Sequence, residues 1–170
     1  MKIVLTGPES SGKTTLASWI AMSYGMRLVH ELARDYLLLQ TNGYNENSVR
    51  EIALLQMWEE RTAEKISDLV VCDTDLLTIL IWQSEKFGHY DVDLYSKWVN
   101  SRVDMYYLCS PDIPWEQDSL RENEHDRSRL FNIYEKMLCE HSKKFTLISG
   151  DFQTRKNEIT QSLFLLLNRL

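Results

Sequence analysis

The sequence has few cysteines, and they follow no metal-binding or disulfide pattern. Cys72, Cys109 and Cys139 are odd in number, far apart, and outside any CxxC or CxxH pair. This spacing argues against a disulfide framework and against a zinc site. We therefore expect all three to be small core residues of a protein in a reducing compartment.

Long apolar runs, internal repeats and linkers rich in proline, glycine or serine are missing as well. No run approaches the roughly 20 apolar residues that a membrane-spanning helix needs. The first residues, 1–6, lead directly into a glycine loop and do not resemble a signal peptide. The sequence therefore predicts a single cytoplasmic domain over residues 1–170, with no membrane segment.

Positive charge is also scarce. The 25 Asp and Glu residues outnumber the 19 Lys and Arg residues, so the formal net charge is −6. This balance argues against a nucleic-acid partner, because a phosphate-tracking surface needs many basic side chains. A small phosphorylated ligand is still compatible, because a glycine loop supplies positive potential from backbone N–H groups and one lysine.

Short apolar runs alternate with helical periods along the whole chain. Strands are expected at 2–6, 26–30, 68–73, 104–109 and 145–148. Helices are expected at 13–24, 31–40, 48–67, 74–87 and 91–101, in a segment that ends near 141, and in a final segment. In that final helix one face is apolar and consists of Leu163, Leu166, Leu167 and Leu170.

This alternation predicts an α/β protein with a three-layer P-loop NTPase fold. Five apolar strands separated by helices indicate a parallel sheet covered on both faces. Ligands of such sheets bind at the carboxyl ends of the strands. Two local signals complete the expected elements: a turn at 41–43, and a capping box formed by Ser48 and Glu51 at the start of the third helix.

A glycine-rich loop follows the first expected strand. The fixed positions of the pattern GxxxxGK[ST] are all occupied, in the run Gly7, Pro8, Glu9, Ser10, Ser11, Gly12, Lys13, Thr14, which Thr15 continues into the helix. In such a loop Lys13 reaches the β- and γ-phosphates, and the Thr14 hydroxyl binds Mg²⁺. A chance match in a chain of this length is expected on the order of once in a hundred or less. The segment therefore predicts a site for ATP or GTP with Mg²⁺.

Acidic residues stand at two other expected strand ends. Asp73 and Asp75 follow the third strand, where a carboxylate can hold Mg²⁺, although a helix N-cap explains the same position. Glu31, Arg34 and Asp35 follow the second strand. There a carboxylate can accept a proton from a substrate hydroxyl and an arginine can hold a phosphate, but a solvated first helical turn is an equal alternative.

A charged segment over about 118–129 contains Arg121, Arg127 and Arg129. Beside a nucleotide site, such a segment can close as a lid and bring arginines onto the transferring phosphoryl group. The alternative is an ordinary solvated surface.

Taken together, these motifs resemble the NadR-type ribosylnicotinamide kinase domain, a relative of the nucleoside kinases. The matching elements are the P-loop with Glu9, Ser10 and Ser11, the E-x-x-R-[DE]-Y run at 31–36, the D-T-D run at 73–75, the P-W-x-x-D-x-x-R run at 114–121, and the pair at 126–127. They occur in the family's order. The H-x-G-H motif of the family's nucleotidyltransferase domain is not matched by any of the four histidines, so we expect a kinase domain alone.

The resemblance implies phosphoryl transfer from ATP, with Mg²⁺, to the 5′-hydroxyl of a ribonucleoside, with nicotinamide riboside as the first choice. It implies catalytic roles for Lys13, Glu31, Asp73, Arg121 and Arg127. It adds Arg34, Asp75 and Trp115 as substrate-binding candidates, and it places the loop 149–151 near an adenine. The competing hypothesis is an ATPase or NTP-binding regulatory module that acts on a protein partner.

Overall fold

The computed structural model describes residues 1–170 except 41–42, 119–124 and 169–170. Its sheet has five parallel strands in the order β2-β3-β1-β4-β5. Their bounds are β1 (Lys2–Thr6), β2 (Arg27–Val29), β3 (Val70–Asp73), β4 (Met105–Cys109) and β5 (Phe145–Ile148). The predicted α/β class, the five strands and their parallel arrangement are thus confirmed. Because all strands run in one direction, their carboxyl ends meet at one edge of the sheet.

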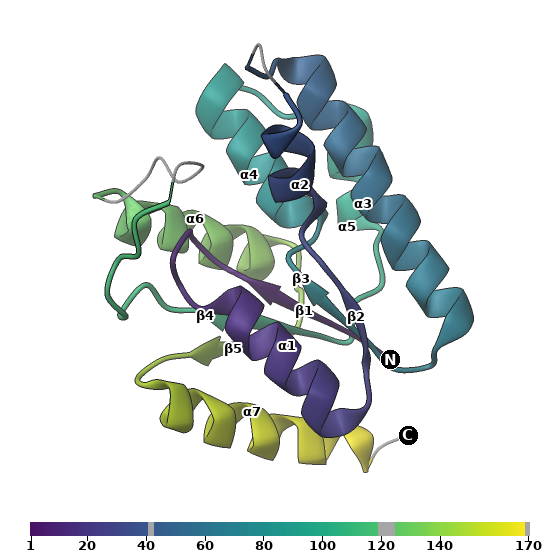
Figure 1. The fold of residues 1–170 in the computed structure, drawn as a ribbon, viewed down its shortest axis with the longest axis vertical. Helices are drawn as coiled ribbons and strands as arrows, with labels where there is room; N and C mark the ends of the chain where they lie inside the picture. The colour runs from purple at the N-terminus through teal and green to yellow at the C-terminus, as the bar shows by residue number, and fades with distance from the viewer. Residues whose placement is uncertain (41–42, 119–124, 169–170) are drawn as a thin grey trace.

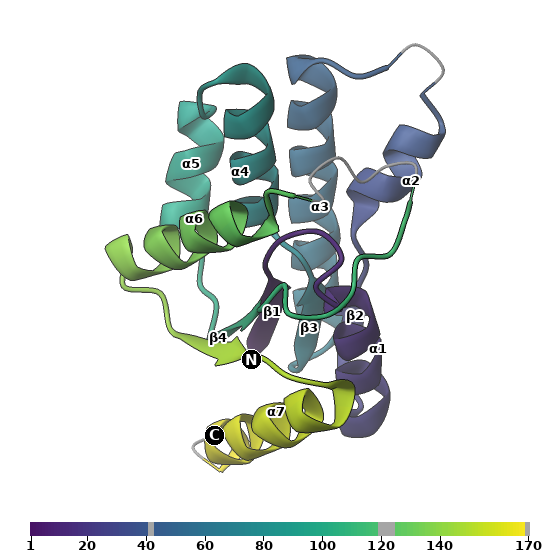
Figure 2. The ribbon, with the colours of Figure 1, turned by 90° about the vertical axis from the view of Figure 1, so that its left-hand side faces the viewer.

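Helices cover both faces of this sheet. They are α1 (Lys13–Tyr24), α2 (Leu32–Leu38), α3 (Glu46–Ile66), α4 (Leu76–Phe87), α5 (Val92–Val99), α6 (Arg127–Glu140) and α7 (Phe152–Leu167). Helices α1 and α7 lie against one face, and α3, α4, α5 and α6 lie on the other (Figure 1, Figure 2). The predicted three layers are therefore present.

Strand residues divide between the two hydrophobic layers by simple alternation. In β1, Ile3 and Leu5 pack with α1 and α7, whereas Val4 packs with the helices of the opposite face. All five residues of β1 are buried, as expected for the central strand of a parallel sheet.

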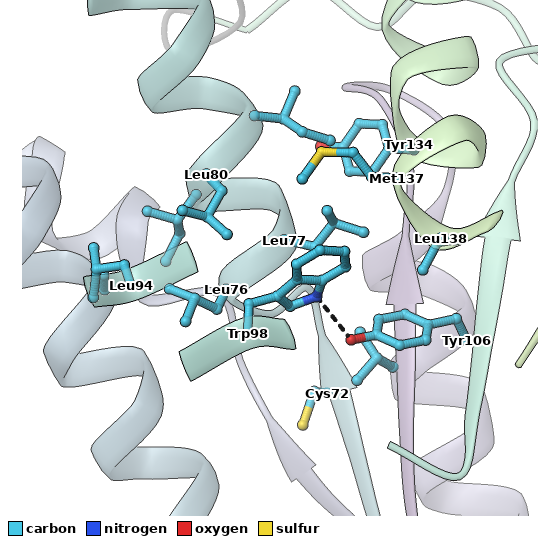
Figure 3. Close-up of a cluster of buried hydrophobic side chains, with 14 of the residues drawn as sticks. Cys72, Leu76, Leu77, Leu80, Leu94, Trp98, Tyr106, Tyr134, Met137 and Leu138 are labelled. Carbon is cyan, nitrogen blue, oxygen red and sulfur yellow. Dashed lines mark hydrogen bonds between the residues drawn. The ribbon is translucent and has the colours of Figure 1, made fainter. Parts of the chain in front are cut away.

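The larger hydrophobic layer encloses a polar chain of contacts (Figure 3). The Trp98 indole N–H donates to the Tyr106 hydroxyl at 3.2 Å, and that hydroxyl donates to Oδ2 of Asp75 at 2.7 Å. Buried polar groups need such partners, because an unmet hydrogen bond in the core costs roughly 1–3 kcal/mol. This contact chain joins α5 and β4 to the start of α4, and so fixes the end of β3.

Two local predictions were wrong. The third helix begins at Glu46 and not at 48, because Asn45 caps it and Ser48 is the second member of the box. Cys72 and Cys109 are buried, but Cys139 is exposed on α6.

Other predictions fall partly outside the described residues. The turn at 41–43 includes 41–42, and Leu170 of the final apolar face also lies beyond the described part. Within that part, none of the helices combines the length and apolar character that crossing a membrane requires.

Candidate functional site

The loop after β1 depends on glycine for its path. A Cβ on Gly7 would lie 2.6 Å from the carbonyl oxygen of Cys109, so only glycine lets the loop pass this close to β4. Gly12 has φ of 81° and begins α1 as its N-cap. Ser10 also has a positive φ, of 51°. Such left-handed residues turn successive backbone N–H groups toward one concave site that suits an anion.

Two side chains of the loop hold its backbone from inside. The Ser11 hydroxyl and the Lys13 ammonium both donate to the carbonyl oxygen of Pro8, each at 2.7 Å. Lys13 is therefore already at the mouth of the loop. A bound phosphate would offer this ammonium a charged acceptor in place of a neutral carbonyl, which is the stronger hydrogen bond.

A cavity of about 450 Å³ opens from this loop and runs between α2, α3, α4 and the start of α6. All nine predicted loop residues, from Gly7 to Thr15, line it. The opposite part of its wall is formed by side chains from the helices and from the residues just before them, among them Glu31, Arg34, Tyr44, Gln56, Thr78, Trp82, Glu85 and Tyr134.

Asp73 lies behind the loop at the end of β3 and is 2% exposed. Burial raises the pKa of its carboxyl group, and the nearby Thr14 hydroxyl and Lys13 ammonium oppose that rise. Its Oδ1 finds no hydrogen-bond partner among the described residues. A buried carboxylate oxygen without a partner, next to a threonine hydroxyl, fits the ligand set of Mg²⁺, which binds few protein oxygens and keeps phosphate and water ligands.

Glu31 lies at the end of β2, just before α2, and lines the cavity. Partial burial raises the pKa of its carboxyl group, Lys13 opposes this effect, and the charge of Asp73 adds to it. The two carboxylates therefore influence each other, although they follow different strands. Of the two, Glu31 is the one that faces the cavity.

Arg34 connects two sequence elements that lie far apart in the chain. Its Nη1 is 2.7 Å from Oδ2 of Asp118, in the P-W-x-x-D-x-x-R run. This ion pair joins α2 to the segment after β4. Arg34 thus lines the cavity with its charge already balanced by a carboxylate.

Two of the predicted substrate-binding residues, Asp75 and Trp115, do not line the cavity. Asp75 is the N-cap of α4, where Oδ1 accepts the Leu77 N–H at 3.0 Å and Oδ2 accepts the Tyr106 hydroxyl. The helix N-cap, which was the alternative to a metal site, is therefore the role of Asp75, the second aspartate of the D-T-D run. Trp115 is outside the cavity lining and packs instead under the guanidinium of Arg127, 5.7 Å from its ring centre.

The arginines of the predicted lid have different surroundings. Arg121 lies outside the described residues. Arg127 is the first residue of α6, and its Nη1 donates to the carbonyl oxygens of Ser10, at 3.2 Å, and Ile113, at 3.0 Å. Arg129 pairs with Glu85 and Asp126. The predicted segment 118–129 is therefore helical from 127 onward.

Sequence reasoning missed several residues of the site. The Oε1 atom of Gln56 accepts the Leu32 N–H at 3.1 Å, while Nε2 has no partner in the described part of the chain. Tyr44 and Trp82 form an aromatic pair with ring centres 4.9 Å apart. A glutamine or tryptophan on a helix, or a tyrosine shortly before one, is too common to select these residues from the sequence.

The parallel five-stranded sheet with a glycine loop after its central strand defines a P-loop nucleotide-binding protein. A protein family described as AAA domain matches residues 2–155, which include the glycine loop and all five strands. The chain therefore belongs to this AAA-domain family.

Individual relatives agree with the predicted NadR resemblance. The trifunctional NAD biosynthesis/regulator protein NadR of Salmonella typhimurium is 27% identical over 161 residues, which is 90% of this chain. The chain spans 39% of the length of that relative.

Solved structures confirm the fold. A NadR protein in complex with NR superposes with a TM-score of 0.70 and 18% identity, over 89% of this chain and 46% of that one. The deoxyadenosine kinase from M. mycoides gives a TM-score of 0.67 and 15% identity, over 98% and 100% of the two chains. At these identities the likeness concerns the fold alone.

Proposed function

We propose that this protein is a kinase that transfers the γ-phosphoryl group of ATP to the 5′-hydroxyl of a ribonucleoside, with nicotinamide riboside as its acceptor. One observation carries this proposal: a single cavity joins the P-loop to a carboxylate, Glu31, and to an aromatic pair. A donor phosphate and an acceptor hydroxyl can therefore meet in one place. The names of the relatives, NadR and deoxyadenosine kinase, support the same reaction class.

The P-loop side of the cavity binds the donor in this proposal. Backbone N–H groups of the loop hold the phosphates, and Lys13 moves from the Pro8 carbonyl to the β- and γ-phosphates. Thr14 and Asp73 would hold Mg²⁺, which neutralises charge on the transferring group. Lys13 also stabilises the charge that develops on the oxygens of the leaving ADP.

Glu31 serves as the proton acceptor. The 5′-oxygen of the acceptor forms its bond to the γ-phosphorus, the bond to the bridging oxygen of ADP breaks, and the hydroxyl proton passes to the Glu31 carboxylate. The raised pKa of Glu31 suits this role, because a stronger base accepts the proton more readily at neutral pH. We assign Asp73 to the metal instead, because it is buried next to the Thr14 hydroxyl.

The charges of the cavity favour a cationic acceptor. Its lining contains four carboxylates, Glu9, Glu31, Glu85 and Glu116, against the two cations Lys13 and Arg34. Arg34 is already paired with Asp118 and Glu85 with Arg129, and the rest of the lining contains three carboxylates against Lys13. The nicotinamide ring of the riboside carries a positive charge, which both the carboxylates and the face of Trp82 attract.

Gln56 and the aromatic pair supply the remaining contacts. The Trp82 indole N–H donates to the Tyr44 hydroxyl at 3.1 Å, which holds the two rings against each other. The available Nε2 of Gln56 can donate to a carbonyl or hydroxyl oxygen of the acceptor. One solved relative, a NadR protein, is in complex with NR, in line with this assignment.

The acceptor assignment predicts a substrate order. We expect kcat/KM for nicotinamide riboside to exceed the values for uridine, cytidine, adenosine and thymidine at saturating Mg²⁺–ATP. Trp82→Leu should lower kcat/KM for the cationic riboside more than for the neutral nucleosides, because the ring face is lost. Trp19→Leu, on the opposite side of the sheet, serves as the matched control. Preference for a neutral nucleoside would overturn the acceptor but not the kinase.

The base assignment predicts a shifted pH profile. Only the ionised Glu31 carboxylate accepts a proton, and burial raises its pKa, so on acidification the protonated, inactive form appears at a higher pH than for an ordinary glutamate. The acid limb of kcat/KM should therefore lie above the usual value of about 4.3. The measurement is kcat/KM between pH 4 and 9, and a constant value down to the ordinary glutamate range would contradict the assignment.

A further inference from the structure

We propose that Arg155 is a positioning residue that holds the P-loop in its nucleotide-binding shape and ties it to the loops after β4 and β5. This inference rests on the proposed function only in that the P-loop binds the nucleotide donor. Arg155 stands at the end of the first turn of α7, far from the loop in sequence, and no motif of the chain includes it.

The guanidinium of Arg155 is almost completely buried and uses all three of its nitrogens. The side chain is 2% exposed. Nε donates to the Gly150 carbonyl at 2.7 Å, Nη1 to the Ser11 carbonyl at 2.7 Å, and Nη2 to the Ser110 carbonyl at 2.9 Å. Nη2 also pairs with the Asp112 carboxylate. One side chain therefore contacts the loops that follow β1, β4 and β5.

The contact with Ser11 acts on the phosphate cradle through peptide geometry. In a trans peptide the carbonyl of one residue and the N–H of the next point in opposite directions. Because Arg155 holds the Ser11 carbonyl on the outside of the loop, the N–H of Gly12 is turned toward the inside. Gly12 is also left-handed, so this peptide plane depends on an external contact to stay in place.

The contacts with Gly150 and Asp112 connect this cradle to the far side of the carboxyl edge. The Gly150 N–H donates to Oδ2 of Asp112 at 2.6 Å, and the Gly150 carbonyl accepts from Arg155. Arg155 and Asp112 thus connect the loops after β4 and β5 to each other and to the P-loop through hydrogen bonds. A nucleotide lying along this edge would find these loops already in fixed relative positions, which lowers the ordering cost of binding.

A lysine at position 155 cannot make the same set of hydrogen bonds. A guanidinium reaches several acceptors at once in a fixed plane, whereas an ammonium is a single point donor. Arg155→Lys keeps the positive charge next to Asp112 but loses some of the hydrogen bonds to the three carbonyl oxygens. It therefore tests the geometry of the contacts separately from the charge.

The experiment compares Arg155→Lys and Arg155→Met with Arg50→Lys as a matched control. Arg50 forms ion pairs with Asp91 and Asp93 away from the P-loop. The first measurement is the Kd for Mg²⁺–ADP, from displacement of a fluorescent ADP analogue, with the Tm of each variant without nucleotide. We expect the Kd to rise by about tenfold or more in Arg155→Lys, because hydrogen bonds to a charged group are strong, and to stay within about twofold in Arg50→Lys.

The second measurement separates positioning from general loosening. KM for Mg²⁺–ATP should rise while KM for the acceptor stays within about twofold, because Arg155 contacts the donor side alone. A folded Arg155→Lys with unchanged Kd for Mg²⁺–ADP overturns the proposal, and so do parallel increases in both KM values. If Arg155→Met does not fold, Arg155→Lys decides. Mg²⁺–ADP binding needs no acceptor, so this test remains valid even if no nucleoside is phosphorylated.

Discussion

Alanine in place of Lys13 should reduce phosphoryl transfer by at least about 10²-fold, because it removes the side-chain cation of the phosphate cradle. The Lys13 ammonium donates to the Pro8 carbonyl, a contact at the cavity surface and not in the core. The Tm without nucleotide should therefore change little. The measurements are kcat with saturating Mg²⁺–ATP and acceptor, and the Tm by thermal melting.

Lys136→Ala is the matched control. The Lys136 side chain is 72% exposed on α6 and faces Glu140 at 3.8 Å, so its loss should leave both kcat and Tm unchanged. Turnover at close to the wild-type rate in Lys13→Ala would refute the P-loop assignment. A large fall in Tm would instead show that Lys13 stabilises the fold itself.

The sheet and the P-loop could be predicted because their signals are local. Buried parallel strands are short apolar runs, and β1 and β5 have the predicted bounds at both ends. The other strands are shorter by one or two residues at one or both ends, where polar residues such as Asp68 and His30 were counted in. The P-loop depends on two glycines with positive φ, Gly7 and Gly12, and Gly7 also passes too close to β4 for a residue with a Cβ.

The wall of the cavity could not be predicted because tertiary packing creates it. Gln56 is one polar residue of a long helix, and only the burial of its Nε2 beside the cavity distinguishes it. Arg155 lies in α7 and belongs to no sequence motif. Its contacts exist because the loops after β1, β4 and β5 come together at its side chain. Asp73 and Asp75 lie two residues apart at one strand end. Asp75 is the one that accepts a hydrogen bond from the Tyr106 hydroxyl on β4, a contact that depends on tertiary packing.

The helix start at α3 shows how two reasonable local signals compete. Ser48 followed by Glu51 fits the capping pattern, but Asn45 followed by Ser48 fits it three residues earlier. Both begin with a residue that can accept a hydrogen bond from the first turn. The earlier start adds only the exposed Glu46 and Asn47, so burial does not distinguish the two starts, and the Ser48 N–H that donates to Oδ1 of Asn45 at 3.1 Å decides between them.

The two carboxylates of the site predict different consequences when each loses its charge. Glu31→Gln should lower kcat by about 10²-fold or more, the usual loss for a general base, with Mg²⁺–ADP binding close to that of the wild type. Asp73→Asn should lower kcat as strongly and also shift the Mg²⁺ dependence of turnover to higher concentrations, because we propose that Oδ1 of Asp73 holds the metal. The measurements are kcat over a Mg²⁺ titration and the Kd for Mg²⁺–ADP.

Asp35→Asn, exposed on the same helix as Arg34, is the control and should behave as the wild type. If Glu31→Gln shifts the Mg²⁺ dependence and Asp73→Asn does not, the two roles are exchanged. If both variants remain fully active, neither strand end takes part in the reaction, and the chemical step must be sought elsewhere along the cavity.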